Sequence, residues 1–237
     1  MADILAPLPD SARARLDELK TSLIAILGDD LDALLLYGSL ARGEYQPERS
    51  DVNLMVVLRD DAEEKLEAIG PTVQLAQFSA RIGVMIVRSD EIPRAADCFP
   101  LLYEDIGRCG VVLHGRSPFE GLTIRGEHKR LRIEQELREV RIRLRRVVAD
   151  NFATAAFGRS IARKVRQIRE PLRALLELRG ETVDDHLAEV IRASGRVYGL
   201  DAEPLFRALE TPREAYEALV TLLERALKDV DELTVED

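Results

Sequence analysis

Two apolar runs of seven residues constrain the fold more than any other feature of this chain. They span Leu31–Tyr37 and Val52–Leu58, and a short polar segment separates them. Runs of this length with so few polar residues are typical of strands that are buried on both faces of a sheet. The sequence therefore predicts that these two strands lie in the middle of a sheet.

Helical and extended segments alternate around these strands up to about residue 120. The leucines of segment 10–27 recur at helical spacing, and Gly28 follows as a stop signal. Gly70 and Pro71 are expected to end a helix that begins at residue 60. The predicted elements are, in order, helix 10–27, strand 31–37, a short helix 39–44, strand 52–58, helix 60–69, an extended run from residue 73, strand 82–87, a helical stretch from residue 89 that Pro93 interrupts, and strand 111–113.

After residue 120 the pattern contains only helices. Apolar residues at three- and four-residue steps predict one long helix over 126–149. A second helix is predicted over 152–178, disturbed at Gly158 and bent at Pro171. Further helices are expected to begin at residues 182 and 201 and at Thr211, which is predicted to be an N-cap. The order indicates an α/β domain with a small mixed sheet over residues 1–120 and an all-α helical bundle over residues 121–237.

Composition narrows the class of protein. Hydrophobic residues make up 46% of the chain, but no apolar run approaches the roughly eighteen residues of a membrane span, and the start of the chain lacks the pattern of a signal peptide. Cys98 and Cys109 lie among apolar residues, so they are predicted to be reduced core cysteines of a cytoplasmic protein. Three scattered histidines and two cysteines form no zinc-site spacing.

The charges are distributed unevenly along the chain. The net charge is −9, yet residues 121–170 carry 14 basic and 6 acidic side chains. The acidic total argues against nucleic-acid binding, because nucleic acid is itself negatively charged. Within the basic segment, Arg138, Arg141 and Arg145 share one flank of the predicted helix. This flank is interpreted either as a solvated face with ion pairs to Glu134, Glu136 and Glu139, or as a positive surface that binds triphosphate or another anion or holds the two domains together.

The segment that links the two apolar strands carries chemistry. A glycine directly after a strand, such as Gly38, allows a sharp turn and a close approach of phosphate to the backbone. Ser39 can present its hydroxyl and nearby N–H groups to an anion. Asp51 and Asn53 stand two residues apart at the entrance of the second strand, so their side chains point to the same side. An acid pair at this place, beside a phosphate-binding turn, would be the minimum for metal-assisted phosphoryl transfer.

These residues resemble the signature of the nucleotidyltransferase superfamily, which contains DNA polymerase β and kanamycin nucleotidyltransferase. The segment 37–43 and the following Ser50 and Asp51 have the form usual in small bacterial members, and residues 108–115 resemble a late strand of the family. The resemblance covers about residues 30–120 and implies that Gly38 and Ser39 hold a nucleoside triphosphate. It also implies that three acids on two strands hold two Mg²⁺ ions, and that the third acid activates the attacking hydroxyl.

The chain departs from this pattern at two of the three acids. Asp51 matches the first acid, Asn53 replaces the second, and Gly83 occupies the position of the third. An amide brings no negative charge and glycine offers no ligand, so Asp51 is expected to hold Mg²⁺ weakly if at all. Glu44 and Asp105 are interpreted as solvated surface acids rather than replacements. Arg42 is a candidate phosphate contact or a partner in a loop salt bridge.

Three functions remain open on the sequence. The first is a catalytically impaired nucleotidyltransferase-fold protein that retains nucleotide or partner binding. The second is an active nucleotidyltransferase with an altered metal site, which moves a nucleoside monophosphate from a nucleoside triphosphate to a small molecule or protein. The third is an interaction scaffold that forms homodimers through its helical domain.

Overall fold

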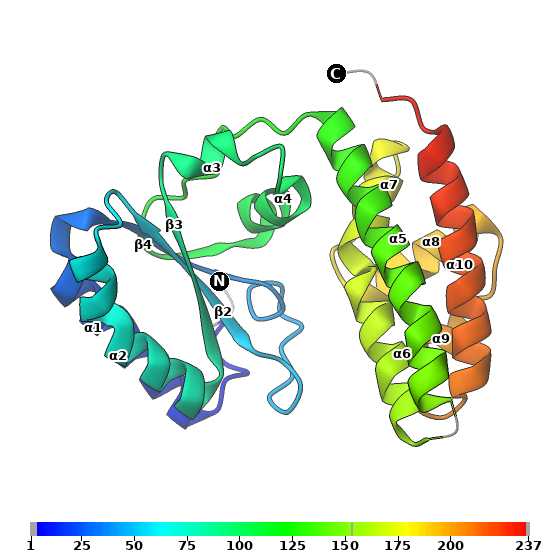
Figure 1. Cartoon of the computed structure of the whole chain (residues 1–237), viewed down its shortest axis with the longest axis horizontal. Helices are drawn as coiled ribbons and strands as arrows, with labels where there is room; N and C mark the ends of the chain where they lie inside the picture. Colours follow the sequence, from blue (N-terminus) through cyan, green and yellow to red (C-terminus); the bar gives the residue numbers. More distant parts are fainter. Residues whose placement is uncertain (1–3, 153, 236–237) are drawn as a thin grey trace. The chain divides into compact units, whose positions relative to one another are not determined.

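The chain forms two compact units in a computed structural model that describes residues 4–152 and 154–235 (Figure 1). Unit 1 comprises Met1–Ala96 and Leu102–Thr123, and unit 2 comprises Asp97–Leu101 and Ile124–Asp237. The assignment of separate functional domains to residues 1–120 and 121–237 stays a prediction.

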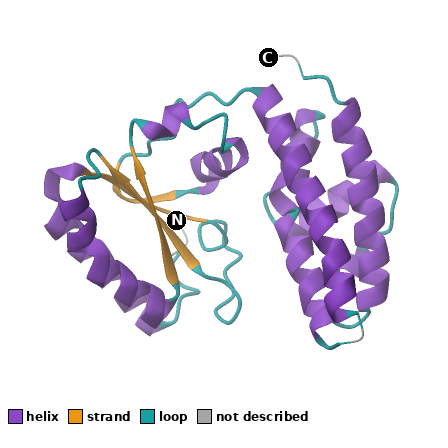
Figure 2. Ribbon diagram, viewed as in Figure 1, coloured by secondary structure: helices purple, strands orange, loops and turns teal. Residues whose placement is uncertain are grey.

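The centre of unit 1 is a four-stranded mixed sheet (Figure 2). Its strands are β1 (Leu31–Tyr37), β2 (Val52–Leu58), β3 (Ile82–Arg88) and β4 (Val111–Gly115), in the spatial order β3-β2-β1-β4. The two apolar runs of the sequence are therefore the two inner strands. They pair antiparallel with each other, β4 pairs antiparallel with β1, and β3 pairs parallel with β2. The predicted α/β fold with a small mixed sheet is confirmed.

Helices α1 (Asp10–Leu27) and α2 (Glu63–Ala80) lie side by side in unit 1 (Figure 1). The leucines of α1 at positions 16, 19, 23 and 27 are buried, as their helical spacing predicts. They share a core with Leu34 and Leu36 of β1 and with alternate residues of β2. Because side chains two apart in a strand share a face, one face of the sheet packs against this helix.

Three predictions for unit 1 are wrong in detail. Residues 39–43 form turns instead of a short helix. Helix α2 continues through Gly70 and Pro71 to Ala80, so the extended run predicted from Val73 is helical. A proline inside a helix removes one hydrogen bond and strains the preceding turn. Here α2 continues through Pro71 and packs along α1. Tertiary packing has outweighed the local stop signal.

Short helices precede the last strand. They are α3 (Glu91–Arg94), which contains Pro93, and α4 (Pro100–Cys109). In the described part of the chain neither cysteine forms a disulfide, and Cys98 is exposed whereas Cys109 is partly buried. The prediction that both cysteines belong to the core is therefore wrong. Their neighbours in the sequence are apolar, but this did not determine whether the cysteines themselves are buried in the fold.

Unit 2 is entirely helical in its described part. Its long helices are α5 (Gly126–Asn151) and α10 (Pro212–Glu232), and four shorter ones lie between them in sequence: α6 (Ala156–Gln167), α7 (Arg169–Leu178), α8 (Leu187–Tyr198) and α9 (Glu203–Phe206). The helix predicted over 152–178 is divided at Ile168, not at Gly158 or Pro171, which both lie within helices. Thr211 is the N-cap residue of α10 and Pro212 begins the helix, as predicted, but the side chain of Thr211 makes no cap hydrogen bond.

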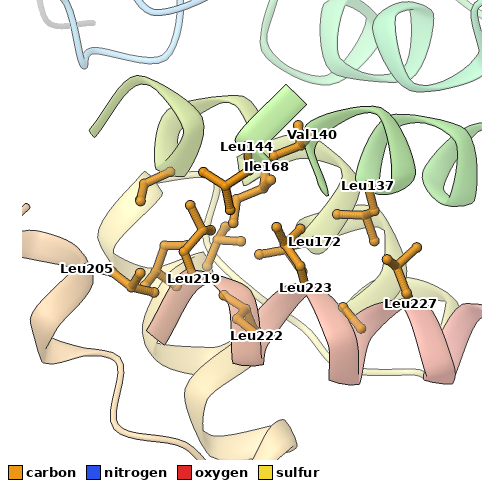
Figure 3. Close-up of a cluster of buried hydrophobic side chains, with 14 of the residues drawn as sticks. Leu137, Val140, Leu144, Ile168, Leu172, Leu205, Leu219, Leu222, Leu223 and Leu227 are labelled. Atoms are coloured by element: carbon orange, nitrogen blue, oxygen red, sulfur yellow. The ribbon is translucent and has the colours of Figure 1, made fainter. Parts of the chain in front are cut away.

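Leucines from several helices fill the core of unit 2 (Figure 3). Leu137 and Leu144 of α5, Leu172 of α7 and Leu222 of α10 are all fully buried. This core shares no buried residue with the core under the sheet of unit 1. Each unit therefore has its own hydrophobic core. None of the helices in residues 4–152 and 154–235 combines the length and the apolarity that a membrane span requires.

Candidate functional site

The turn after β1 begins at a glycine with left-handed backbone geometry. Gly38 has a φ of 76°, a conformation that glycine adopts without steric cost. Its carbonyl oxygen accepts a hydrogen bond from the N–H of Arg42 at 3.1 Å, and the carbonyl of Ser39 accepts one from the N–H of Glu44 at 2.8 Å. These bonds fold residues 38–44 into a compact turn at the end of a buried strand.

Asn53 lies directly against this turn. It pairs across the sheet with Tyr37, the residue before Gly38. A Cβ atom built on Gly38 would lie only 2.6 Å from Nδ2 of Asn53. Real Cβ atoms do not approach a neighbour so closely, so any other residue at position 38 would require the amide of Asn53 to move. The structure thus places the turn and the position of the second family acid in contact.

Gly83, which the resemblance assigns to the third acid, lies beside Asn53. It is the register partner of Asn53 in the parallel pair of β2 and β3. A Cβ atom built on Gly83 would lie 3.8 Å from Oδ1 of Asn53 and 3.8 Å from Oε1 of Gln77. These are ordinary contact distances, so a side chain at position 83 would reach the amide of Asn53. Neither of these two neighbouring strand positions carries a charge.

Asp51 lies at the entrance of β2 and is paired with an arginine. Nε and Nη2 of Arg81 both lie 2.8 Å from Oδ1 of Asp51. Nη1 of Arg81 also donates to the carbonyl of Glu48 at 3.4 Å. Arg81 ends α2 in the left-handed conformation, with a φ of 54°. Arg81 is not among the residues predicted for the site, although its place directly before the acid-free strand indicated that it lies near Asp51.

The donor set does not fit two divalent cations. A pair of Mg²⁺ ions needs several carboxylate oxygens, whereas this site offers one carboxylate, one amide and a glycine. The carboxylate is shared with a guanidinium that already neutralises it. In the described part of the chain, no group of three or more histidine, cysteine or acidic residues could hold a metal ion. Positions 51, 53 and 83 therefore provide a single carboxylate, which Arg81 already pairs.

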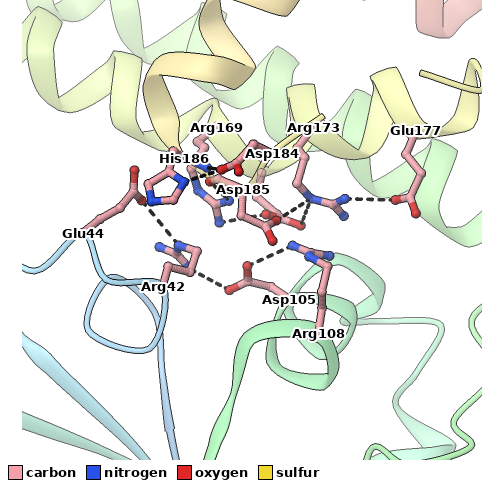
Figure 4. Close-up of polar contacts among 11 residues, drawn as sticks. Arg42, Glu44, Asp105, Arg108, Arg169, Arg173, Glu177, Asp184, Asp185 and His186 are labelled. Atoms are coloured by element: carbon pink, nitrogen blue, oxygen red, sulfur yellow. Dashed lines mark hydrogen bonds and ion pairs between the residues drawn. The ribbon is translucent and has the colours of Figure 1, made fainter. Parts of the chain in front are cut away.

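Arg42 belongs to a separate ion-pair cluster in unit 1 (Figure 4). Its Nη1 donates to Oδ2 of Asp105 at 2.8 Å, and its Nε lies 3.6 Å from a carboxylate oxygen of Glu44. Oδ1 of Asp105 accepts from Arg108 at 3.2 Å. Asp105 is buried, with 6% of its surface exposed, so its interpretation as a solvated surface acid is wrong. The loop salt bridge predicted for Arg42 is present, and its contact with phosphate stays a prediction.

Unit 2 contains its own buried charge cluster, which the sequence did not reveal. Arg169 and Arg173 of α7 are buried, and both pair with the carboxylate of Glu170, at 2.8 and 3.2 Å. Arg169 also donates to the carbonyl of Asp185 at 3.0 Å, and Arg173 donates to Glu177 at 3.1 Å (Figure 4). These bonds attach α7 to the segment before α8. They give the two arginines a structural role in the helical unit.

The basic flank of α5 is largely engaged in ion pairs within unit 2. Arg138 pairs with Glu134 and with Asp231, each at 2.7 Å, and Arg141 pairs with Glu224 at 2.7 Å. The hydrogen bond that Arg138 donates to Glu134 raises the pKa of Arg138 above its usual range, and the one that it donates to Asp231 adds to the effect. These contacts support the interpretation of the flank as a solvated, ion-paired face. They connect α5 to α10.

The chain belongs to the nucleotidyltransferase domain family, whose pattern matches residues 16–147, more than half of the sequence. Its fold is similar to that of spectinomycin adenyltransferase AAD(9) from Enterococcus faecialis, determined with ATP and spectinomycin. The TM-score is 0.56 at 13% sequence identity, over 93% of this chain and 99% of that chain. At this identity the likeness shows the fold alone. Curated proteins give no significant match.

Proposed function

We propose that this member of the nucleotidyltransferase family binds a nucleoside triphosphate at the Gly38–Ser39 turn and is catalytically impaired. One observation carries the proposal: Asn53 and Gly83, which the resemblance assigns to the second and third acids, are register partners on neighbouring strands. Gly38, at a φ of 76°, forms the sharp turn that would hold the phosphates. The carboxylates that would hold metals and take a proton are missing from positions 53 and 83.

The expected loss of rate is large. A general base typically accelerates a reaction about 100- to 10,000-fold, and metal ions add several kcal/mol of charge stabilisation. Gly83 can serve as neither base nor ligand. Asp51 is paired with Arg81, so a metal ion would have to compete with a guanidinium for its only strong ligand.

The alternative is an active enzyme that transfers a nucleoside monophosphate to a small molecule or protein. The exposure of Asp51 favours it, since 57% of this side chain is accessible and one Mg²⁺ could reach it together with the phosphates of a bound nucleotide. The similar adenyltransferase was determined with ATP and a small molecule, which makes a small-molecule acceptor the first class to test.

One experiment separates these functions. The four nucleoside triphosphates are titrated calorimetrically into the protein with and without Mg²⁺ or Mn²⁺, and pyrophosphate release is followed with candidate acceptors. Binding without release supports the proposal, whereas metal-dependent release supports the alternative. If no nucleotide binds, the scaffold function remains, and sedimentation would test the predicted homodimer of the helical unit.

A gain-of-function variant tests the reasoning about the acids. Asn53→Asp combined with Gly83→Asp restores the family pattern, and the 3.8 Å clearance at position 83 leaves room for the new side chain. We expect this double variant to bind Mn²⁺ and to release pyrophosphate at least tenfold faster than the natural chain. Adding Asp51→Asn should abolish the gain. If the double variant folds, binds nucleotide and stays at the natural rate, the assignment of the two positions is wrong.

A further inference from the structure

A polar pocket lies between α5 and α6 in unit 2, and it is separate from the Gly38–Ser39 turn. It has a volume of about 190 Å³ and is lined by Arg132, Glu136, Glu139 and Arg143 of α5 and by Lys164 and Gln167 of α6. This space is large enough for several water molecules or a small oxyanion. We call it the Lys164 pocket.

Lys164 is an unusual residue for such a pocket because it is buried. Only 4% of its surface is exposed, and its Nζ donates to Oε1 of Gln167 at 2.8 Å. In the described part of the chain, no carboxylate forms an ion pair with Lys164 within 4.0 Å. Buried charges in proteins are normally paired. A neutral amide is therefore the partner where a negative group is expected.

The other charges of the pocket do not compensate for this ammonium. Arg132 pairs with Glu136 at 2.7 Å, and Arg143 pairs with Glu139. Both acids are thus engaged by arginines of their own helix, which leaves Lys164 without a carboxylate partner of its own. Burial lowers the pKa of Lys164, the positive charges of Arg143 and Arg163 lower it further, and the attraction of Glu139 offsets only part of this shift. A negative group that entered the pocket would oppose this lowering.

We propose that the Lys164 pocket binds a small oxyanion, a phosphate or carboxylate group of a ligand. Lys164 would supply a charge-assisted hydrogen bond from the floor of the pocket, which is stronger than a bond between neutral groups. Arg143, whose side chain is 64% exposed, would close on the ligand from the rim. This inference does not depend on the proposed nucleotide site, since all lining residues belong to unit 2.

The test uses the full chain labelled with ¹⁵N and two probes, inorganic phosphate and succinate. We expect saturable shifts of amide resonances in α5 and α6 with at least one probe, and at least tenfold weaker binding in Lys164→Met. Lys164→Arg keeps the charge and should retain binding. Lys228→Met is the matched control, because this lysine of α10 is 76% exposed and its loss should change nothing.

The two probes distinguish the source of the oxyanion. Saturation by phosphate alone assigns the pocket to phosphate compounds, and saturation by succinate alone assigns it to carboxylates. A wild-type protein that binds neither probe at millimolar concentrations overturns the inference. Unchanged phosphate affinity in Lys164→Met also overturns it, because the anion would then bind elsewhere, for example at the turn of unit 1.

A measurement on the natural chain guards against a folding defect in the variant. The pKa of Lys164 can be followed by NMR of ¹³C-labelled lysine with and without the bound probe. An oxyanion in contact with the ammonium must raise this pKa, while binding at a distant site must leave it unchanged. Failure of nucleotide binding in the calorimetric titration would not affect either result.

Discussion

Replacing Gly38 by alanine should destabilise unit 1 through two separate costs. The first is backbone strain, because a non-glycine residue at a φ of 76° costs about 1–2 kcal/mol. The second is overlap, because the new Cβ would lie 2.6 Å from Nδ2 of Asn53, and overpacking typically costs about 1–3 kcal/mol. We expect a total loss of about 2–5 kcal/mol in the free energy of unfolding.

The chain offers a control that isolates the overlap. Gly43 also has a φ of 76°, but no heavy atom lies within 4 Å of a Cβ built on it. Gly43→Ala should therefore show the strain alone, about 1–2 kcal/mol. In a double-mutant cycle, Asn53→Ala should recover about 1–3 kcal/mol of the loss caused by Gly38→Ala.

Native-state hydrogen exchange of the amides of β1 and β2 is the suitable assay. The chain has no tryptophan, and two units with separate cores need not unfold in one transition. Exchange of individual amides reports the stability of unit 1 without interference from the helical unit. Equal losses for Gly38→Ala and Gly43→Ala would refute the close contact between the turn and Asn53.

Three further predictions concern other parts of the chain. Arg81→Gln removes the cation beside Asp51. This ion pair is half exposed and worth about 0.2–1 kcal/mol, so the affinity for Mn²⁺ measured by calorimetry should rise roughly 1.4- to 5-fold. An unchanged affinity would contradict the competition between Arg81 and the metal ion for Asp51. Gly158→Ala should destabilise unit 2 by about 1–3 kcal/mol, because its Cβ would lie 2.5 Å from a backbone oxygen of the facing segment. Native-state hydrogen exchange of the amides of α6 measures this loss, and unchanged exchange would contradict the overlap. Burial lowers the pKa of Lys164, so the unfolded chain holds this proton to higher pH than the folded chain does. The stability of unit 2, compared with that of Lys164→Met, should therefore rise as the pH increases from the lowered pKa toward 10.5, the ordinary value of lysine. A stability difference in chemical denaturation that does not change with pH would contradict this.

The sequence predicted the centre of the sheet correctly because the residues that are buried there are apolar at almost every position. The strands over Leu31–Tyr37 and Val52–Leu58 are apolar at almost every position, and they form the inner strands of the sheet. The leucines of α1 follow helical spacing and are buried. Patterns of this kind arise directly from the geometry of strands and helices, so they can be read without knowledge of the neighbours.

Other elements depend on packing that the sequence does not show. Gly70 and Pro71 are local stop signals, yet α2 continues through them because it packs along α1. The sequence predicts Asp105 to be a surface acid, but the structure buries it beside Arg42. The approach of Gly38, Asn53 and Gly83 follows from the pairing of three strands, and the family resemblance predicted it. The pairing of Asp51 with Arg81 lay outside that pattern.

The backbone at Arg81 suggests that thermal stability alone does not account for an arginine there. Its left-handed conformation costs a non-glycine residue about 1–2 kcal/mol, while a half-exposed ion pair returns only about 0.2–1 kcal/mol. Glycine adopts this conformation freely but loses about 0.5–1 kcal/mol more conformational entropy on folding, so the two residues would give similar stability. An engineer who judged position 81 by heat resistance would therefore treat them as interchangeable, although glycine would remove the cation that faces Asp51 and change the charge of the proposed nucleotide site.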